Sequence, residues 1–297
     1  MQTVNDVLDA VERQLHRARI DSPAPEAAII VSHVLGITRG RLGVLQALGE
    51  RLTADTVTAI EDIVSQRATR IPLQHLLGET TFYGVDLTIE PGVFIPRVET
   101  EVLVETTLAH FGHNPPDDLK LLDLCTGSGA IAAALADRLA PHGITTRIWA
   151  VDLNPHAVDL ARRNTAAYNV TVLCADATHV DSLTAADSEL ASWVGRFDAV
   201  VSNPPYIPTE TPVTQQEAEK DPQLALYGGS ADGLAVPIAI AHTAAACLAP
   251  GGFFMMEHDE THAAELASKL DDTLDWDQLH TVQDLTGTDR FVSAVRA

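Results

Sequence analysis

The part of the chain that is most informative about the fold is Leu119-Lys-Leu-Leu-Asp-Leu-Cys-Thr-Gly-Ser-Gly129. Its first six residues are mainly leucine, which predicts a strand that is buried on both faces of a sheet. The glycines that follow carry no Cβ, so they allow a ligand to approach the backbone closely. We predict a helix directly after this loop, over residues 128–139. A strand, a glycine-containing loop and a helix in this order are typical of an α/β sheet.

The residues beyond this stretch continue the alternation of strands and helices. We expect further strands at residues 148–151, 170–174, 197–201, 253–256 and near Phe291, and helices at residues 155–167, 235–249 and 260–270. Apolar strands that alternate with helices predict a mostly parallel, doubly wound sheet of the α/β class. In such a sheet the ligand binds at the carboxyl ends of the strands.

The residues before this region predict a small helical domain. Apolar residues from Val4 to Leu15 recur at helical spacing, Ser22-Pro23 begins a second helix that Gly36 ends, and Thr53 begins another. From Phe82 to Ile95 the apolar period changes to two, with a turn at Pro91-Gly92, which predicts a β-hairpin. We therefore expect a helical domain over residues 1–75, a hairpin linker over 76–100 and the sheet domain over 101–297.

Charge and composition limit the possible partners. The net charge of −22 and the pI of about 4.7 disfavour a nucleic-acid substrate, because an acidic surface repels phosphate. The three cysteines, Cys125, Cys174 and Cys247, are too few for a disulfide framework and are interpreted as buried thiols. The start of the chain does not resemble a signal peptide, and the longest apolar stretch, 235–249, is too short to cross a bilayer. We expect a cytoplasmic protein without a membrane partner.

Three features at the predicted strand ends suggest a nucleoside site. Gly127 and Gly129 fit a dinucleotide-binding loop, although a tight turn without a ligand would use the same residues. Asp152 ends the second strand, where a carboxylate can accept hydrogen bonds from both hydroxyls of a ribose; the alternative is a helix cap, for which Asn154 is better placed. The pair Asp176-Ala177 follows the third strand, where an adenine would lie, or where an acidic loop would need no ligand.

The fourth strand ends in the most specific motif, Asn203-Pro204-Pro205-Tyr206. The nitrogen of an amide or of an aromatic amine is a poor nucleophile, because its lone pair is delocalised. The side-chain oxygen of Asn203 and the carbonyl of Pro204 can each accept one N–H bond of such a group, and the prolines make the turn rigid. Tyr206 offers an aromatic face to a planar substrate or to a sulfonium cation. A dehydrogenase has no use for this motif, whereas an enzyme that methylates an NH₂ group does.

Together these features resemble the S-adenosylmethionine-dependent amino-methyltransferases, which include adenine, guanine and protein-glutamine enzymes. The segment Pro72–Glu101, which ends in Pro-Arg-Val-Glu-Thr-Glu, is similar to the linker of the release factor glutamine N5-methyltransferase family, as is Gly228-Gly229-Ser-Ala-Asp-Gly-Leu234 after the predicted catalytic turn. The resemblance implies a Rossmann-like doubly wound methyltransferase sheet with an N-terminal helical domain that docks the substrate. It also implies that the enzyme methylates the glutamine of the Gly-Gly-Gln motif in peptide chain release factors, using S-adenosylmethionine and leaving S-adenosylhomocysteine.

The same resemblance implies the residues of the site. Those expected at the cofactor are Cys125, Thr126, Gly127, Ser128, Gly129, Asp152, Asp176, Ala177 and Asn203, and those expected at the glutamine are Asn203, Pro204, Pro205 and Tyr206. The chain departs from the family at three positions, since Cys125 replaces a glycine, Val98 a proline and Ala177 an aromatic residue of some members. These departures bear on cofactor affinity.

Two rival functions and one rival site are weaker. An adenine or guanine N-methyltransferase would need a basic surface, which the net charge of −22 argues against. A non-catalytic nucleotide-binding module would leave the motif at residues 203–206 without a purpose. His258 and His262 have a helical spacing that two zinc ligands could use, but the glutamate of a zinc-protease motif is missing. We therefore expect a solvated helix start there, and no metal.

Overall fold

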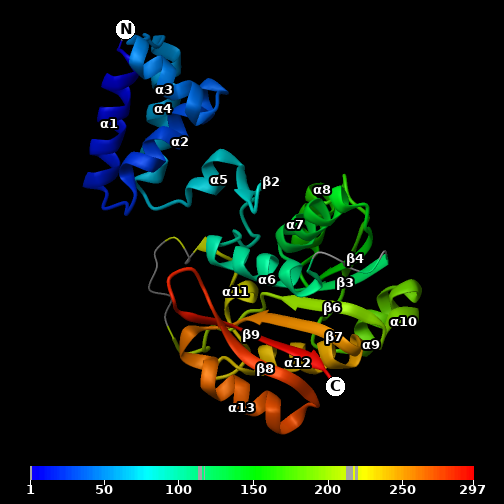
Figure 1. The fold of residues 1–297 in the computed structure, drawn as a ribbon. Coiled ribbons are helices and arrows are strands. Elements are labelled where there is room, and N and C mark those ends of the chain that lie inside the picture. Colours follow the sequence, from blue (N-terminus) through cyan, green and yellow to red (C-terminus); the bar gives the residue numbers. More distant parts are fainter. Residues whose placement is uncertain (1, 113–115, 117, 212–216, 218–219) are drawn as a thin grey trace. The chain divides into compact units, whose positions relative to one another are not determined.

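Helices near the N-terminus and a mixed sheet after them form two separate units in the computed structural model, which describes residues 2–112, 116, 118–211, 217 and 220–297 (Figure 1). One unit ends at Glu79 and also includes Glu217, and the other runs from Thr80 to Val213 and from Asp221 to the C-terminus. Each unit has its own hydrophobic core.

The first unit consists only of helices, as predicted. Its helices are α1 (Val4–Arg17), α2 (Pro23–Leu35), α3 (Arg39–Leu48), α4 (Ala54–Arg67) and α5 (Leu73–Leu77). Thr3 and Asp6 cap α1 reciprocally, and Thr53 caps α4 with its side chain. Gly36 ends α2 in the left-handed conformation, as predicted. Ser22 stands at the start of α2 but its side chain makes no cap hydrogen bond, because its backbone is not extended there (φ −123°, ψ 63°).

A buried arginine holds the base of this unit together. Arg67, at the end of α4, donates two hydrogen bonds to the carboxylate of Glu26 on α2, at 2.7 and 3.0 Å. Its third nitrogen donates to Glu217 at 3.0 Å, and Arg70 donates to the same carboxylate at 2.9 Å. Paired donors and acceptors of this kind offset the cost of burying the charges. Glu217 follows the predicted catalytic turn in sequence. Nevertheless it belongs to the helical unit, where Arg67 and Arg70 bind it.

Among the described residues, no single helix is long and apolar enough to span a membrane. The pair α2 and α3 passes such a test only together, by length and composition, and is bent by 91°. Within the unit, α2 buries Ile30 and Val31 in the hydrophobic core.

The predicted hairpin exists, but its turn lies elsewhere. Strands β1 (Glu79–Phe82) and β2 (Val85–Thr88) pair through a two-residue turn at Tyr83-Gly84, where both residues have positive φ (47° and 82°). The turn predicted at Pro91-Gly92 is therefore wrong as a hairpin, and residues 93–95 form no strand. The alternation that suggested a strand there arises because Val93 and Ile95 are buried in an irregular segment.

The second unit contains a seven-stranded sheet in the order β5-β4-β3-β6-β7-β9-β8. Its strands are β3 (Asp118–Leu124), β4 (Thr145–Asp152), β5 (Val170–Cys174), β6 (Phe197–Ser202), β7 (Leu248–Glu257), β8 (Trp276–Gln283) and β9 (Asp289–Arg296). The five strands from β3 to β7 are parallel, and β9 is antiparallel to both of its neighbours. The predicted doubly wound sheet is confirmed, and β8 is a strand that the sequence pattern missed.

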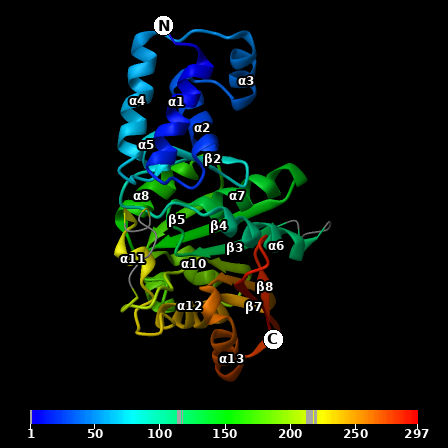
Figure 2. The ribbon, with the colours of Figure 1, turned by 90° about the vertical axis from the view of Figure 1, so that its left-hand side faces the viewer.

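Helices cover both faces of this sheet (Figures 1 and 2). Its α-helices are α6 (Glu101–Phe111), α7 (Ala130–Leu139), α8 (Pro155–Asn164), α9 (Val180–Ala186), α10 (Ser188–Trp193), α11 (Gln223–Leu226), α12 (Ala235–Cys247) and α13 (Ala263–Thr273), and short 3₁₀ turns lie at η1 (Val98–Thr100), η2 (Ala140–His142) and η4 (Glu260–His262). Leu121 and Ala199 face the core under α6 and α7, whereas Leu122 and Val200 face the core under α12 and α13. This alternation is the period of two expected of strands.

The order of the strands places the site. The chain passes from β3 outward through β4 to β5, then returns to β6 on the other side of β3. The loops after β3 and β6 therefore leave neighbouring strands in opposite directions, which opens a crevice at their carboxyl ends. The ends are in register, since Leu124 lies beside Val151 on one side and Ser202 on the other.

Gly129 makes a close contact that fixes how α7 begins. It has φ 81°, and a Cβ at this position would lie 3.1 Å from both Cα and Cβ of Ala161 on α8. Gly127 also has a positive φ (57°), but a Cβ there would meet nothing within 4 Å. Gly127 and Gly129 thus share a positive φ but differ in the space that a Cβ would have.

We predict that Gly127→Ala lowers the free energy of unfolding by about 1–2 kcal/mol, the cost of a left-handed side chain. Gly129→Ala should cost this amount and a further ~1–3 kcal/mol for the forced overlap with α8. Urea denaturation of both variants measures the difference. Equal losses would show that α8 yields freely and that the close contact is not required.

Candidate active site

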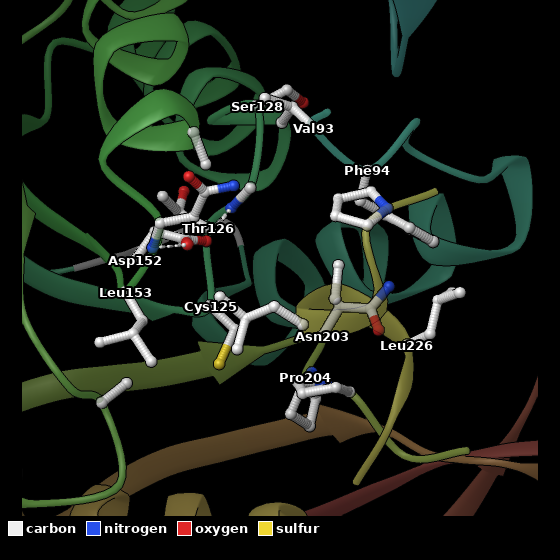
Figure 3. Close-up of a pocket in the computed structure, with 18 of the residues that line it drawn as sticks. Val93, Phe94, Cys125, Thr126, Ser128, Asp152, Leu153, Asn203, Pro204 and Leu226 are labelled. Atoms are coloured by element: carbon white, nitrogen blue, oxygen red, sulfur yellow. Dashed lines mark hydrogen bonds between the residues drawn. The ribbon is translucent and has the colours of Figure 1, made fainter. Parts of the chain in front are cut away.

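A single pocket in the second unit brings the predicted site residues together at the carboxyl ends of β3 to β6. Figure 3 shows Asp152 and Thr126 on one side of it, Asn203 and Pro204 on the other, and Cys125 between them. Of the predicted site residues, all but Gly129 line the pocket, namely Cys125, Thr126, Gly127, Ser128, Asp152, Asp176, Ala177, Asn203, Pro204, Pro205 and Tyr206. Gly129 ends the same loop, as the N-cap of α7.

The glycine loop is shaped by backbone hydrogen bonds and three residues with positive φ. Thr126 N–H donates to the Val151 carbonyl at 2.9 Å, and Gly129 N–H donates to the Thr126 carbonyl at 2.9 Å. Cys125, Gly127 and Gly129 have φ of 61°, 57° and 81°. Cys125 therefore adopts a left-handed conformation that favours glycine, at a steric cost that a side chain normally avoids.

Asp123 supports this loop from within the sheet. It is fully buried, and one of its carboxylate oxygens accepts from the Thr126 hydroxyl at 2.6 Å and from the Ala132 N–H at 3.2 Å. Burial raises the pKa of Asp123 from 3.8 to about 7, although these hydrogen bonds oppose the rise. The carboxyl group ties the loop to the first turn of α7.

Asp152 is held by the backbone on both of its oxygens. It accepts from Gly127 N–H at 2.8 Å and from Asn154 N–H at 2.9 Å, so its carboxylate is fixed at the edge of the pocket. Burial raises the pKa of Asp152, and the backbone hydrogen bonds oppose that rise. The alternative role as a helix cap is excluded, because Asn154 caps α8 with its own side chain.

Asp176 and Ala177 follow β5, the neighbour of β4, and line the pocket beside Asp152. One oxygen of Asp176 accepts from the backbone and the hydroxyl of Thr178 at 2.9 and 2.5 Å, which closes a tight turn. Burial favours the neutral acid, but the bonds from Thr178 outweigh it and lower the pKa of Asp176. Ala177 is buried and lines the pocket with a small apolar surface.

The amide of Asn203 is oriented by two acceptors behind it. Its nitrogen donates to Glu257 at 3.0 Å and to the Thr100 hydroxyl oxygen at 3.2 Å. Among the described residues, none donates a hydrogen bond to its oxygen, which is therefore left for a ligand of the pocket. The Asn203 oxygen is thus available to accept from an N–H group, and its role toward a substrate stays a prediction.

Glu257, at the end of β7, is the main residue that the sequence analysis missed. It is buried and accepts from Thr100, Asn203 and Tyr206, the last at 3.1 Å. Burial raises the pKa of Glu257. Burial also raises the pKa of Tyr206 well above its usual value, and the charge of Glu257 adds to this rise. A single acid that ends the apolar run Phe253–Met256 was the signal for it.

The pocket wall that follows the turn at residues 203–206 was also missed by the sequence prediction. Residues Pro222 and Leu224–Tyr227 line the pocket, and Leu224 remains 54% exposed at its rim. Arg97 anchors this segment by donating to the buried carboxylate of Asp221 at 2.7 Å. The Ile207 N–H also donates to the Leu226 carbonyl at 2.8 Å. This wall depends on pairing between residues far apart in sequence.

Two glycines pack closely beside the turn at residues 203–206. A Cβ on Gly233 would lie 2.2 Å from the carbonyl oxygen of Tyr206, and a Cβ on Gly228 would lie 1.9 Å from the Gly233 carbonyl. Only glycine fits at either position. The motif that resembled the family is thus required by close backbone packing under Tyr206.

Two side-chain expectations are wrong. His258 and His262 are buried (0% and 6% exposed), so they are not a solvated helix start. His258 instead continues the pairing of β7 with β9, since its N–H donates to the Arg290 carbonyl at 2.9 Å. Cys174 is exposed and Cys125 half-buried, so only Cys247 is the buried thiol expected of all three. Burial and nearby carboxylates raise the pKa of the Cys125 thiol, which disfavours it as a nucleophile. The described residues contain no cluster of three or more His, Cys, Asp or Glu side chains that could hold a metal ion.

Comparisons with known proteins agree with this structure. Residues 6–78 match the family model described as PrmC N-terminal domain, and residues 85–219 match the model described as methyltransferase small domain. The release factor glutamine methyltransferase of Mycolicibacterium smegmatis is 39% identical over 100% of this chain and 99% of its own. The protein of the same name from Deinococcus radiodurans is 38% identical over 99% of both chains, and that from Mycobacterium tuberculosis is 37% identical over 99% of this chain and 92% of its own.

The doubly wound sheet and the pocket at its strand ends define a methyltransferase of the Rossmann-like class. Full-length similarity to the relatives above assigns the family more narrowly. The chain belongs to the release factor glutamine methyltransferase family.

The raised pKa of Asp123 makes a prediction about stability. Because the folded protein holds this proton more tightly than the unfolded chain, the unfolded state loses it first as pH rises from about 4 to about 7. The free energy of unfolding should therefore fall over this range, by at least about 1 kcal/mol more in the wild type than in Asp123→Asn. Urea denaturation at intervals of pH compares the two slopes, and parallel profiles would contradict the assignment.

Proposed function

We propose that this protein transfers a methyl group from S-adenosylmethionine to the side-chain amide nitrogen of a glutamine in peptide chain release factors, at the Gly-Gly-Gln motif. The observation that carries the proposal is the arrangement of Asn203, which lines the pocket, has its nitrogen held by Glu257 and Thr100, and has an oxygen to which no described residue donates. Because the Asn203 amide is fixed, its oxygen can only accept, and it favours a substrate group that donates N–H hydrogen bonds. The relatives' names supply the substrate class.

The residues of the glycine loop and of the strand ends fit the cofactor. Gly127 leaves open space where a side chain would stand, and Asp152 presents a carboxylate at the pocket edge that can accept from ribose hydroxyls. Asp176 and Ala177 would border the adenine, with Thr126 and Ser128 in the loop that faces it. S-adenosylmethionine, when bound, supplies an activated methyl group on a sulfonium and leaves as S-adenosylhomocysteine.

The chain's own residues would orient the reacting nitrogen. The Asn203 oxygen and the Pro204 carbonyl would each accept one N–H bond of the glutamine amide, which directs the nitrogen lone pair toward the methyl carbon. Transfer would form one N–C bond and break one C–S bond of the cofactor, and the electron pair of that C–S bond would stay on the sulfur. The nitrogen then releases one proton to water. Apolar side chains such as Leu226 and Ile207 would exclude water from the amide before transfer.

The partner would be the whole release factor rather than free glutamine. Remote contacts are needed to hold a weak nucleophile in line, and a free amino acid makes few of them. We infer that the helical unit supplies such contacts, because it contains none of the site residues and yet leaves large apolar side chains exposed, Val44 at 44% and Leu48 at 70%. Release factors act in translation, so we place the activity in the cytoplasm, and the net charge of −22 disfavours direct binding to nucleic acid.

The assigned roles of Asn203 and Asp152 predict two different effects, one on the rate of methyl transfer and one on cofactor affinity. Asn203→Ala should lower the rate of methyl transfer to a release factor about a hundredfold or more while binding S-adenosylmethionine normally. Asp152→Ala should weaken S-adenosylmethionine binding by about 1.5–3 kcal/mol, since it removes hydrogen bonds to a charged group. Single-turnover assays and calorimetry measure the two effects. Near-normal transfer by Asn203→Ala, or an unchanged affinity in Asp152→Ala, would remove the corresponding role.

The docking role of the helical unit predicts a change in one Michaelis constant only. Leu48→Asp should raise KM for the release factor at least about fivefold and leave KM for S-adenosylmethionine unchanged. The reason is that a charge would replace an apolar side chain that docking would bury. Leu285→Asp is the matched control, since Leu285 is 82% exposed in the other unit. If both variants behave alike, α3 takes no part in docking.

A further inference from the structure

The buried acid that holds the Asn203 nitrogen has a consequence for substrate selection beyond the mechanism above. Glu257 does not line the pocket, yet it accepts hydrogen bonds from three residues that do: Thr100 at 2.6 Å, Asn203 at 3.0 Å and Tyr206 at 3.1 Å. It is 2% exposed, at the end of a strand whose other inward residues are apolar. A carboxylate is costly to bury, so its position calls for an explanation.

We propose that Glu257, together with Thr100, is the positioning residue that fixes which way the Asn203 amide faces, and that it thereby makes the site select a carboxamide over a carboxylate. The proposal rests on the proposed function, because it concerns how the glutamine is recognised. Glu257 acts through Asn203 and touches no reacting atom.

The hydrogen bonds leave the amide only one orientation. Thr100 donates its single hydroxyl proton to Glu257, so its oxygen can only accept from Asn203. The carboxylate of Glu257 also only accepts. If the amide of Asn203 were turned over, its oxygen would lie 3.0 Å from a carboxylate oxygen and would repel it. The nitrogen of Asn203 must therefore face Glu257, and its oxygen must face the pocket.

Other contacts hold Glu257 in place and favour its charged form against the effect of burial. Burial raises the pKa of Glu257, but the hydrogen bonds from Thr100 and Tyr206 and the charge of Arg290 oppose that rise. Arg290 is itself fixed by Asp284, to which it donates at 2.9 Å. The neighbouring charge of Glu99 acts the other way. Glu257 thus accepts from three donors, and this is the arrangement needed to hold the NH₂ group of Asn203.

This orientation has a consequence for specificity. A glutamine amide can donate to the Asn203 oxygen, whereas the carboxylate of a glutamate in the same place can only repel it. If the Asn203 amide were free to turn, its nitrogen could donate to that carboxylate. Loss of Glu257 should therefore weaken the preference for glutamine as well as the rate.

The test compares Glu257→Gln, Thr100→Val and Thr100→Ser with the wild type, using a release factor and a copy whose target glutamine is changed to glutamate. Glu260→Gln serves as the control, since Glu260 is an exposed acid three residues along whose ion pair is with Arg290, at 3.6 Å. Measurements are kcat, KM for S-adenosylmethionine and the inhibition constant of the glutamate copy. Circular dichroism checks that each variant is folded.

We expect Glu257→Gln to lower kcat about tenfold to a hundredfold with KM for S-adenosylmethionine unchanged, and the glutamate copy to inhibit it at least about tenfold better than it inhibits the wild type. Thr100→Val should show the same pattern more weakly, and Thr100→Ser, which keeps the hydroxyl, should restore most of the loss. Glu260→Gln should match the wild type.

The proposal is overturned if folded Glu257→Gln keeps the wild-type rate and the wild-type discrimination against glutamate. It is also overturned if the rate falls without any change in that discrimination, because Glu257 would then be structural only. Should Glu257→Gln fail to fold, the Thr100→Val and Thr100→Ser pair decides the matter by the same two criteria. Failure of the wild type to methylate any glutamine would instead refute the proposed function, so the two failures are distinct.

Discussion

The pairing of β3 with β6 is the constraint on which the site depends. These parallel strands are neighbours in the sheet although 78 residues separate Leu124 from Ser202, whose hydroxyl donates to the Leu124 carbonyl at 2.7 Å. Because their loops leave in opposite directions, the glycine loop and the turn at Asn203 meet across one crevice. A shift of register at this pair would separate the residues proposed to bind cofactor from those proposed to bind substrate.

Three acids near the carboxyl ends of β3, β4 and β7 have different surroundings. Asp123 is surrounded by the sheet and ties the glycine loop to α7, whereas Asp152 is gripped by two backbone N–H groups and presents its outer edge to the pocket. Glu257 lies behind the catalytic turn and gathers three side-chain donors. Burial raises the pKa of all three, and the donors around each of them decide what it can do.

The sequence predicted the parts of the structure that local patterns encode. The strand ends at Asp152 and Asn203 follow apolar runs, and Gly36 and Thr53 mark helix boundaries by their own backbone preferences. The hairpin turn was misplaced because Pro91-Gly92 carries a stronger turn signal than Tyr83-Gly84, which the structure uses instead. The contacts of Glu257, Thr100 and Asp221 could not be predicted from local patterns, even where an acid ending an apolar run marks Glu257, since each has its partner at least 50 residues away.

The most direct test of the proposed function is to locate the methyl group itself. A purified release factor would be incubated with this protein and S-adenosylmethionine, digested, and sequenced by tandem mass spectrometry. We predict one methyl group on the side-chain nitrogen of the glutamine in the Gly-Gly-Gln motif, and none when that glutamine is replaced. Methylation of another residue, or of DNA or ribosomal RNA with none on the release factor, would contradict the proposed recognition of a glutamine amide by Asn203.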